Sequence, residues 1–364
     1  MPENPLYVTR PELPPLEEFL PHLEKIWESR QLTNSGPYHQ DFEEALARYL
    51  GVEYLSLFCN ATIALITALQ ALRISGEVIT SPYSFPATSH ALLWNGIKPI
   101  FVDIDPITLN IDANRIGDAI TPNTTGILPM HCYGQPCDVN HLQNIADNYN
   151  LRLVYDAAHA FKVEVDGKSI LNFGDLSVLS FHATKVFNTF EGGAIISPDT
   201  KTKQRIDRLK NFGYVDEQTV VAPGINGKMS EFNAALGIVQ IQYADQVLER
   251  RKAVANRYIQ RLKLLKGIRI VESTNHSYFP ILITAAYPLT RDELYNRFRE
   301  SNIWVRKYFS PLLTEFPMYR DFPSADPKNL PNAINASRNI LCLPLFPSLS
   351  NSEQDRVLKI LESA

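Results

Sequence analysis

Between residues 53 and 155 the chain alternates short runs of β-branched and aromatic residues with longer stretches rich in alanine and leucine. The runs predict strands at 53–58, 77–80, 98–102, 125–130 and 151–155, and the stretches predict helices at 61–72, 86–94 and 138–149. Strands that are separated by helices are joined by crossover connections, and such connections produce a mainly parallel sheet covered by helices. The expected fold class is therefore α/β.

After this alternation the pattern changes, because two strands follow one another without a helix between them. The segments expected in this part are strands at 178–181, 194–197 and 277–283, helices at 229–265, 290–300 and 350–362, and a proline-rich surface loop at 311–331. A long helix after the last strands of a sheet commonly links one domain to the next. We expect a large domain over residues 1–245 and a smaller α+β domain over residues 246–364.

The composition narrows the class of protein. Of the 364 residues, 45% are hydrophobic and 20% are charged, which supplies enough apolar surface for a core and excludes a disordered or fibrous chain. The 35 basic and 39 acidic residues give a formal net charge of −4, and no run of lysine or arginine stands out. We therefore expect neither a nucleic-acid partner nor an anionic membrane surface as a partner.

The N-terminus and the cysteines indicate the compartment. No basic segment followed by an apolar run opens the chain, and no stretch approaches the roughly 18 consecutive apolar residues of a membrane-spanning helix. The four cysteines, Cys59, Cys132, Cys137 and Cys342, are too scattered for a disulfide framework. No second Cys/His pair completes a zinc site with Cys132 and Cys137. We expect free thiols, no metal and a reducing cytoplasm.

In an open parallel sheet, ligands bind beyond the carboxyl ends of the strands, so the residues after each strand are candidates for a site. Asn60, Ala61 and Thr62 follow the first strand and open a helix. The free N–H groups of this helix and the Thr62 hydroxyl can bind a phosphate, although Asn60 could instead only cap the helix. Phe85 follows the next strand, where its ring could stack on a planar ligand or belong to the core.

Two further strands lead to an acid and a lysine. Asp156 could cap a helix, but a buried carboxylate needs a cationic partner, which the protonated ring nitrogen of a cofactor can supply. Lys185 could be a solvated surface residue, or it could form a Schiff base if its pKa is lowered. Gly192 and Gly193 allow a sharp turn and a close approach behind it. Phosphate cradle, aromatic ring, acid and lysine follow in the order that a pyridoxal phosphate site requires.

Other short motifs occur in order along nearly the whole chain. They are LTNSGP at 32–37, PIFVDID at 99–105, DAAHA at 156–160, SFHATK at 180–185, GINGKMSE at 224–231, AALG at 234–237, RKYFSPL at 306–312 and LPLFP at 343–347. Each is weak alone, but the ordered set resembles the sugar aminotransferases of the DegT/DnrJ/StrS family. The resemblance implies the fold type I of pyridoxal phosphate-dependent transferases, like that of aspartate aminotransferase.

The resemblance also implies roles for single residues around pyridoxal 5′-phosphate. Lys185 matches the lysine that binds the cofactor covalently and then acts as the general base. Asp156 matches the carboxylate that keeps the pyridine nitrogen protonated, and Phe85 matches the aromatic ring that stacks on it. His159 stands where many members have glutamine, near the phenolic oxygen of the cofactor.

The remaining positions concern the phosphate, the substrate and a partner. Ala61, which replaces a common glycine, Thr62 and Ser180 match the phosphate-binding groups. Asn226 matches a residue that reaches the cofactor phosphate of a neighbouring subunit, so a homodimer with shared active sites is expected. The positions expected at the substrate are Lys228, Arg306 and Tyr308.

The resemblance implies transfer of the amino group of L-glutamate, leaving 2-oxoglutarate, to a nucleotide-linked keto-deoxysugar. Residues 13–18 with Ile26 and Trp27 are most similar to members that aminate carbon 4 of a dTDP-linked 4-keto-6-deoxyglucose for O-antigen or another surface glycan. Open alternatives are a 3-keto sugar or a UDP-sugar on the same scaffold, a non-catalytic regulator that only binds the cofactor, and a pyridoxal-dependent lyase or dehydratase.

Overall fold

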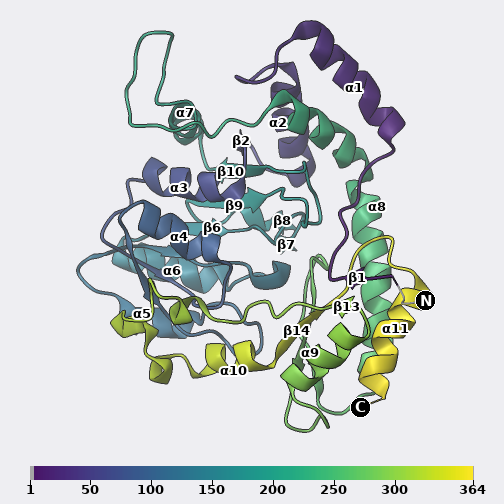
Figure 1. Cartoon of the computed structure of the whole chain (residues 1–364). Coiled ribbons are helices and arrows are strands. Elements are labelled where there is room, and N and C mark those ends of the chain that lie inside the picture. The colour runs from purple at the N-terminus through teal and green to yellow at the C-terminus, as the bar shows by residue number, and fades with distance from the viewer. Residues whose placement is uncertain (1–3, 364) are drawn as a thin grey trace.

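A seven-stranded sheet forms the centre of the computed structural model, which describes residues 4–363 (Figure 1). Across the sheet the strands are β2 (Tyr54–Phe58), β10 (Gly193–Ser197), β9 (Leu176–Ser180), β6 (Arg152–Asp156), β5 (Thr124–Leu128), β3 (Glu77–Thr80) and β4 (Lys98–Phe101). Only β10 runs antiparallel to its neighbours; the other pairings are parallel. The predicted α/β fold class is confirmed.

Helices cover both faces of this sheet, because successive side chains of each strand point to opposite faces. Val78 packs in the core that holds α3 (Ala61–Ala71), α4 (Pro86–Trp94) and α7 (Thr200–Leu209). Ile79, the next residue, packs in the core that holds α2 (Pro37–Leu50), α6 (Val139–Tyr149) and the first half of α8 (Glu231–Leu262). Strand β3 therefore packs against helices on both of its sides.

A second, smaller core lies at the other end of α8 (Figure 1). Here β11 (Ile268–Ile270), β12 (Phe279–Ile283) and β14 (Ile340–Leu343) form an antiparallel sheet, packed against α8, α9 (Arg291–Glu300) and α11 (Asn351–Glu362). The expected boundary at residue 245 falls inside the continuous helix α8. The division into two domains stays a prediction.

The remaining elements are short or peripheral. They are β1 (Leu6–Tyr7), α1 (Leu16–Ser29), η1 (Ala113–Arg115), α5 (Ile116–Ala119), η2 (Cys132–Gly134), β7 (Glu164–Val165), β8 (Lys168–Ser169), η3 (Ile170–Asn172), β13 (Ile303–Trp304), η4 (Leu313–Glu315), η5 (Pro323–Ala325), η6 (Pro327–Asn329) and α10 (Pro331–Asn339). The two strands β1 and β13 pair in parallel, so the beginning of the described chain lies beside its C-terminal part. Among residues 4–363, no helix has both the length and the apolar character needed to cross a bilayer.

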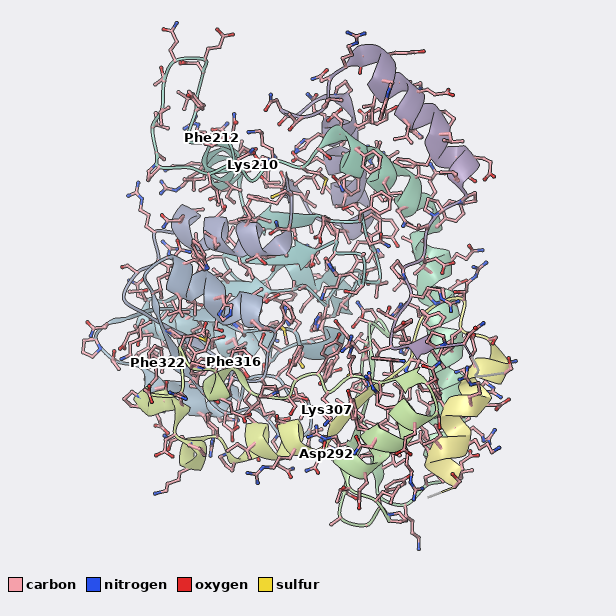
Figure 2. All side chains as sticks on the ribbon, viewed as in Figure 1. Lys210, Phe212, Asp292, Lys307, Phe316 and Phe322 are labelled. Carbon is pink, nitrogen blue, oxygen red and sulfur yellow. The ribbon has the colours of Figure 1, made fainter. Side chains whose placement is uncertain are left out.

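The proline-rich segment at 311–331 is structured, as expected, but it is not confined to the surface. Leu313 and Tyr319 are fully buried and pack against Phe101 of β4. Phe316 and Phe322, labelled in Figure 2, lie partly buried against the same cluster. This packing ties the segment that follows β13 to the edge of the large sheet.

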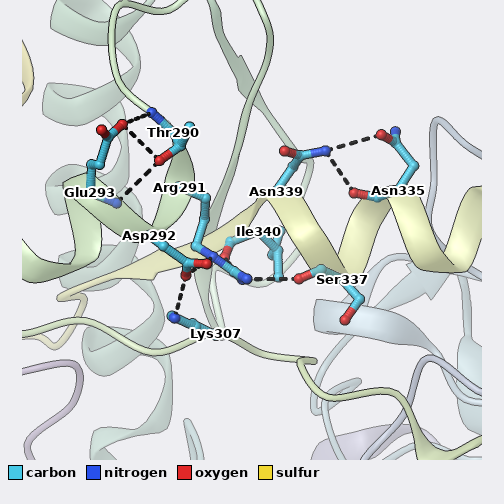
Figure 3. Close-up of polar contacts among 9 residues, drawn as sticks. All are labelled: Thr290, Arg291, Asp292, Glu293, Lys307, Asn335, Ser337, Asn339 and Ile340. Carbon is cyan, nitrogen blue, oxygen red and sulfur yellow. Dashed lines mark hydrogen bonds and ion pairs between the residues drawn. The ribbon is translucent and has the colours of Figure 1, made fainter. Parts of the chain in front are cut away.

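Polar contacts join α9, α10 and the segment after β13 (Figure 3). The buried guanidinium of Arg291 donates a hydrogen bond to the carbonyl of Ser337, at 2.9 Å. Asp292, the next residue, accepts a hydrogen bond from the ammonium of Lys307. These bonds fix the backbone on either side of β13, and with it the position of Tyr308, which directly follows Lys307.

Candidate active site

The ends of four strands meet at one edge of the large sheet. Gly193, the first residue of β10, pairs with Phe58 of β2 on one side and with Ser180 of β9 on the other. Asp156 is the last residue of the neighbouring strand β6. A cavity of about 260 Å³ lies here, and the predicted site residues that line it are Ala61, Thr62, Phe85, Asp156, His159, Ser180, Lys185 and Tyr308.

One wall of the cavity is the start of α3. The Asn60 side chain accepts a hydrogen bond from Ile63 N at 2.9 Å, so Asn60 does cap this helix. The cap does not exclude a phosphate site, because among the described residues no acceptor takes the N–H groups of Ala61 and Thr62, which are free to bind an anion. A Cβ at Gly193 would stand 2.8 Å from Ala61 N, so only glycine lets β10 pass this close. The site fits a phosphate group.

The buried carboxylate of Asp156 also lines the cavity. Its Oδ2 accepts a hydrogen bond from the Thr88 hydroxyl at 2.7 Å, and its Oδ1 accepts one from Ala158 N at 3.1 Å. No ion pair with a side chain between residues 4 and 363 balances its charge, and burial raises its pKa. A cationic group in the cavity would favour the charged form of Asp156 and lower its pKa again, and a protonated pyridine nitrogen has this character.

Lys185 follows β9, and its ammonium faces the same cavity. Burial lowers the pKa of Lys185 to about 8, while the Asp156 carboxylate acts in the opposite direction. Because more of the amine is neutral near physiological pH, Lys185 is a better nucleophile and base than a solvated lysine.

Phe85 and His159 line the same cavity. Phe85 is 56% exposed at the start of α4, so the interpretation of this ring as a core residue is wrong and its face is available to a ligand. His159 is buried, and burial holds its pKa well below the usual value.

Three predicted residues do not line this cavity. Asn226 is exposed on the segment between α7 and α8, which forms a hairpin that extends from the body of the molecule (Figure 1). The Lys228 ammonium donates a hydrogen bond to the Asn211 side chain at 2.9 Å and lies 4.9 Å from the centre of the Phe212 ring. Phe212, labelled in Figure 2, lies at the base of this hairpin. Arg306 is exposed, and its backbone pairs with Cys342.

Sequence reasoning missed two residues of the site. Thr88, which donates to Asp156, lies three residues after Phe85 in the first turn of α4, so its place after a strand could have indicated it. Tyr278 directly precedes β12 of the small sheet, and it lines the cavity near Lys185. No motif marks Tyr278, because only the packing of the two sheets brings it there.

The cysteines give no indication of another centre. Cys132, Cys137 and Cys342 are buried and Cys59 is partly buried, and all four are free thiols. Within residues 4–363, no three histidine, cysteine or acidic side chains come together as metal ligands would.

Comparisons with known proteins agree with this geometry. Residues 16–362 match the DegT/DnrJ/EryC1/StrS aminotransferase family. The chain is 54% identical to a dTDP-4-amino-4,6-dideoxy-D-glucose transaminase of Shigella dysenteriae, over 96% of each chain.

Two solved structures superpose closely on this chain. One is DesI in the presence of its TDP-sugar product, with a TM-score of 0.94 and 35% identity over 99% of this chain and 93% of that one. The other is NtdA from Bacillus subtilis with bound cofactor PMP, with a TM-score of 0.86 and 30% identity over 96% of this chain and 81% of that one. The chain therefore belongs to the DegT/DnrJ/EryC1/StrS family of pyridoxal phosphate-dependent aminotransferases.

Proposed function

We propose that this aminotransferase moves the amino group of L-glutamate to a nucleotide-linked 4-keto-6-deoxysugar, with dTDP-4-keto-6-deoxy-D-glucose as the acceptor. The identity of 54% to the Shigella dysenteriae dTDP-4-amino-4,6-dideoxy-D-glucose transaminase supports this choice of sugar. The observation that carries the chemistry is that one cavity holds both Lys185, whose pKa is lowered, and Asp156, a buried carboxylate that forms no ion pair with a side chain of residues 4–363.

The residues of the cavity divide the work of the reaction. When bound, pyridoxal phosphate supplies a conjugated ring that withdraws electrons from the carbon next to the transferred nitrogen. Asp156 stabilises positive charge on the ring nitrogen, and the face of Phe85 limits the tilt of the ring. The start of α3 and the Ser180 hydroxyl hold the phosphate. Lys185, as the neutral amine, takes the proton from the α-carbon of glutamate and returns a proton to carbon 4 of the sugar.

A homodimer with shared active sites is part of the proposal. The hairpin between α7 and α8 exposes apolar side chains and extends from the body of the molecule (Figure 1). The exposed side chains are Phe212, Tyr214, Val215, Val220 and Val221. Such a patch is typical of a protein interface, and a second copy that covers it would receive Asn226 at its cofactor phosphate. We place the enzyme in the cytoplasm, in the synthesis of a surface glycan such as O-antigen.

The visible absorbance of the purified protein tests the function. We expect a yellow band in the holoenzyme that bleaches on addition of L-glutamate and returns when dTDP-4-keto-6-deoxy-D-glucose is added. A protein that stays colourless with pyridoxal phosphate would contradict the proposal. Restoration of the band by a 3-keto sugar or a UDP-sugar, and not by this acceptor, would contradict the choice of sugar.

Replacement of the lysine tests the site. Lys185→Ala is expected to abolish turnover and covalent cofactor binding, with an unchanged far-ultraviolet circular dichroism spectrum. Lys266→Ala, which removes an exposed lysine beyond α8, is the matched control and should keep full activity. A Lys185→Ala variant that retains transamination would contradict the assignment.

A further inference from the structure

Tyr278 and His159 form a contact between the small sheet and the large one. The Tyr278 hydroxyl lies 3.2 Å from His159 Nε2, and both side chains line the cavity. The Lys185 ammonium lies 6.0 Å from the centre of the Tyr278 ring. The Tyr278 hydroxyl therefore belongs to the reaction cavity, although its residue precedes a strand of the smaller core.

The hydrogen bond that His159 Nδ1 accepts determines which partner donates in the contact between Tyr278 and His159 Nε2. Tyr133 N donates a hydrogen bond to His159 Nδ1 at 3.2 Å. The left-handed backbone of Tyr133, with φ of 54°, directs the N–H to this nitrogen. A nitrogen that accepts cannot carry a proton, so the single proton of the neutral ring is on Nε2. His159 consequently donates and the Tyr278 oxygen accepts.

The hydroxyl proton of Tyr278 is then left without a partner. Within residues 4–363 no protein acceptor takes this proton, and burial raises the pKa of Tyr278, so the hydroxyl keeps it. Tyr278 is partly buried and lines the cavity, so its hydroxyl proton is available to a ligand oxygen there. The titratable groups that face the pair are Lys185, Tyr133, Tyr308, Cys132, Cys342 and Arg251.

The segment before Tyr278 is held firmly to the large sheet. Asn275 Nδ2 donates to the carbonyls of His159 and Phe161, both at 2.9 Å. The hydroxyls of Ser273 and Ser277 donate to the carbonyl of Tyr133, at 2.7 and 2.9 Å. The loop that carries His159 and the segment that carries Tyr278 are therefore fixed to each other, and the hydroxyl does not depend on a mobile side chain.

We propose that Tyr278, oriented by His159, donates the hydrogen bond to the phenolic oxygen of the bound cofactor. This inference rests on the proposed function. On the pyridine ring, the carbon that bonds to Lys185 lies between the phenolic oxygen and the phosphate arm. The phosphate belongs at the start of α3, and neither Tyr278 nor His159 has a hydrogen bond or ring contact with that helix. The phenolic oxygen therefore faces Tyr278, and His159, whose only donor is engaged, acts through it.

The pH titration of the visible band of the holoenzyme tests the assignment without turnover. The visible band reports the protonation of the nitrogen that joins Lys185 to the cofactor, and the phenolic oxygen accepts a hydrogen bond from this protonated nitrogen. A hydrogen bond from Tyr278 stabilises the negative charge on the phenolic oxygen and so lowers the pKa of the nitrogen. Tyr278→Phe should therefore raise the midpoint of the pH titration by about one to two pH units.

Three further variants separate orientation from packing. His159→Leu should raise the midpoint in the same direction, because the Tyr278 hydroxyl is no longer aligned. His159→Gln, which keeps an acceptor for Tyr133 N and a donor for Tyr278, should restore the wild-type midpoint. Tyr83→Phe is the matched control, because the Tyr83 hydroxyl bonds to Tyr133 and to the Tyr308 carbonyl outside the cavity and should leave the midpoint unchanged.

Nitrogen NMR of the cofactor-free protein tests the tautomer separately, and the signal of His159 is expected to show the proton on Nε2. A proton on Nδ1, or an unchanged midpoint in a yellow Tyr278→Phe holoenzyme, would overturn the inference and leave the proposed function standing. A wild-type protein without a visible band would instead refute the proposed function.

Discussion

At the scale of single residues, burial and the Asp156 carboxylate shift the pKa of Lys185 in opposite directions, and this pKa determines the reactivity of the amine. Burial disfavours the ammonium, and the Asp156 carboxylate favours it; the pKa is lowered from 10.5 to about 8 because burial is the larger effect. Asp156 experiences the same burial, which raises its pKa. Burial thus disfavours the charged form of both groups, and a cationic ring nitrogen beside Asp156 would favour the carboxylate again.

The pKa of Lys185 predicts the pH dependence of cofactor uptake. Only the neutral amine attacks the aldehyde of pyridoxal phosphate, so the rate of uptake by the cofactor-free protein should rise with pH and level off above about 8. Asp156→Ala removes the carboxylate that raises the pKa of Lys185, so the midpoint of the curve of uptake rate against pH should move to lower pH. Stopped-flow absorbance over pH 6 to 10 measures both, with Thr67→Val, a buried threonine outside the cavity, as the control. A midpoint near 10.5 in the wild type would contradict the structure.

At the scale of elements, the reversed strand β10 builds the phosphate wall. Because β10 runs against β2 and β9, its first residues lie at the carboxyl ends of these two parallel strands. The backbone of Gly193 then passes between Leu179 O, at 2.9 Å from a hypothetical Cβ, and Ala61 N, at 2.8 Å from it. A sheet of only parallel strands would place the far end of this strand here, without the paired glycines.

Gly193→Ala tests this wall. The added methyl must displace backbone atoms of α3 or β9, so we expect a loss of stability of about 1–3 kcal/mol and weaker cofactor binding. Gly117→Ala is the matched control, because nothing lies within 4 Å of a Cβ at Gly117. Thermal unfolding and titration with pyridoxal phosphate measure the two effects. Equal cofactor affinity in both variants would show that β10 does not shape the phosphate site.

At the scale of the whole molecule, each cavity needs contributions from distant parts of the chain. The large sheet supplies Lys185 and Asp156, and the small sheet supplies Tyr278. The hairpin between α7 and α8 extends from the body of the molecule (Figure 1), and Asn226 at its base does not line the cavity of its own chain. In the proposed dimer this hairpin completes the partner's site, so inactive chains with different defects should complement each other.

Mixed dimers test this arrangement. Lys185→Ala removes the lysine, and Asn226→Asp places a carboxylate against the cofactor phosphate, so each homodimer should be nearly inactive. In a mixed dimer one site combines an intact Lys185 from one chain with an intact Asn226 from the other, and co-expression should therefore restore part of the activity. Light scattering of the purified sample checks for the dimer. Mixed dimers without activity would contradict the shared site.

The strand and helix pattern of residues 53–155 determined the α/β class, because a sheet buried on both faces needs strands that are apolar throughout and helices between them. The positions of Asn60, Phe85, Asp156 and Lys185, each at or after the end of a strand, likewise placed most of the cavity, since parallel strands end at one edge. The sequence could not place Tyr278, show that Phe85 is exposed, or exclude Lys228 and Arg306 from the cavity. Those positions depend on how the small sheet and the hairpin pack against the large sheet, and such long-range packing leaves no local pattern in the chain.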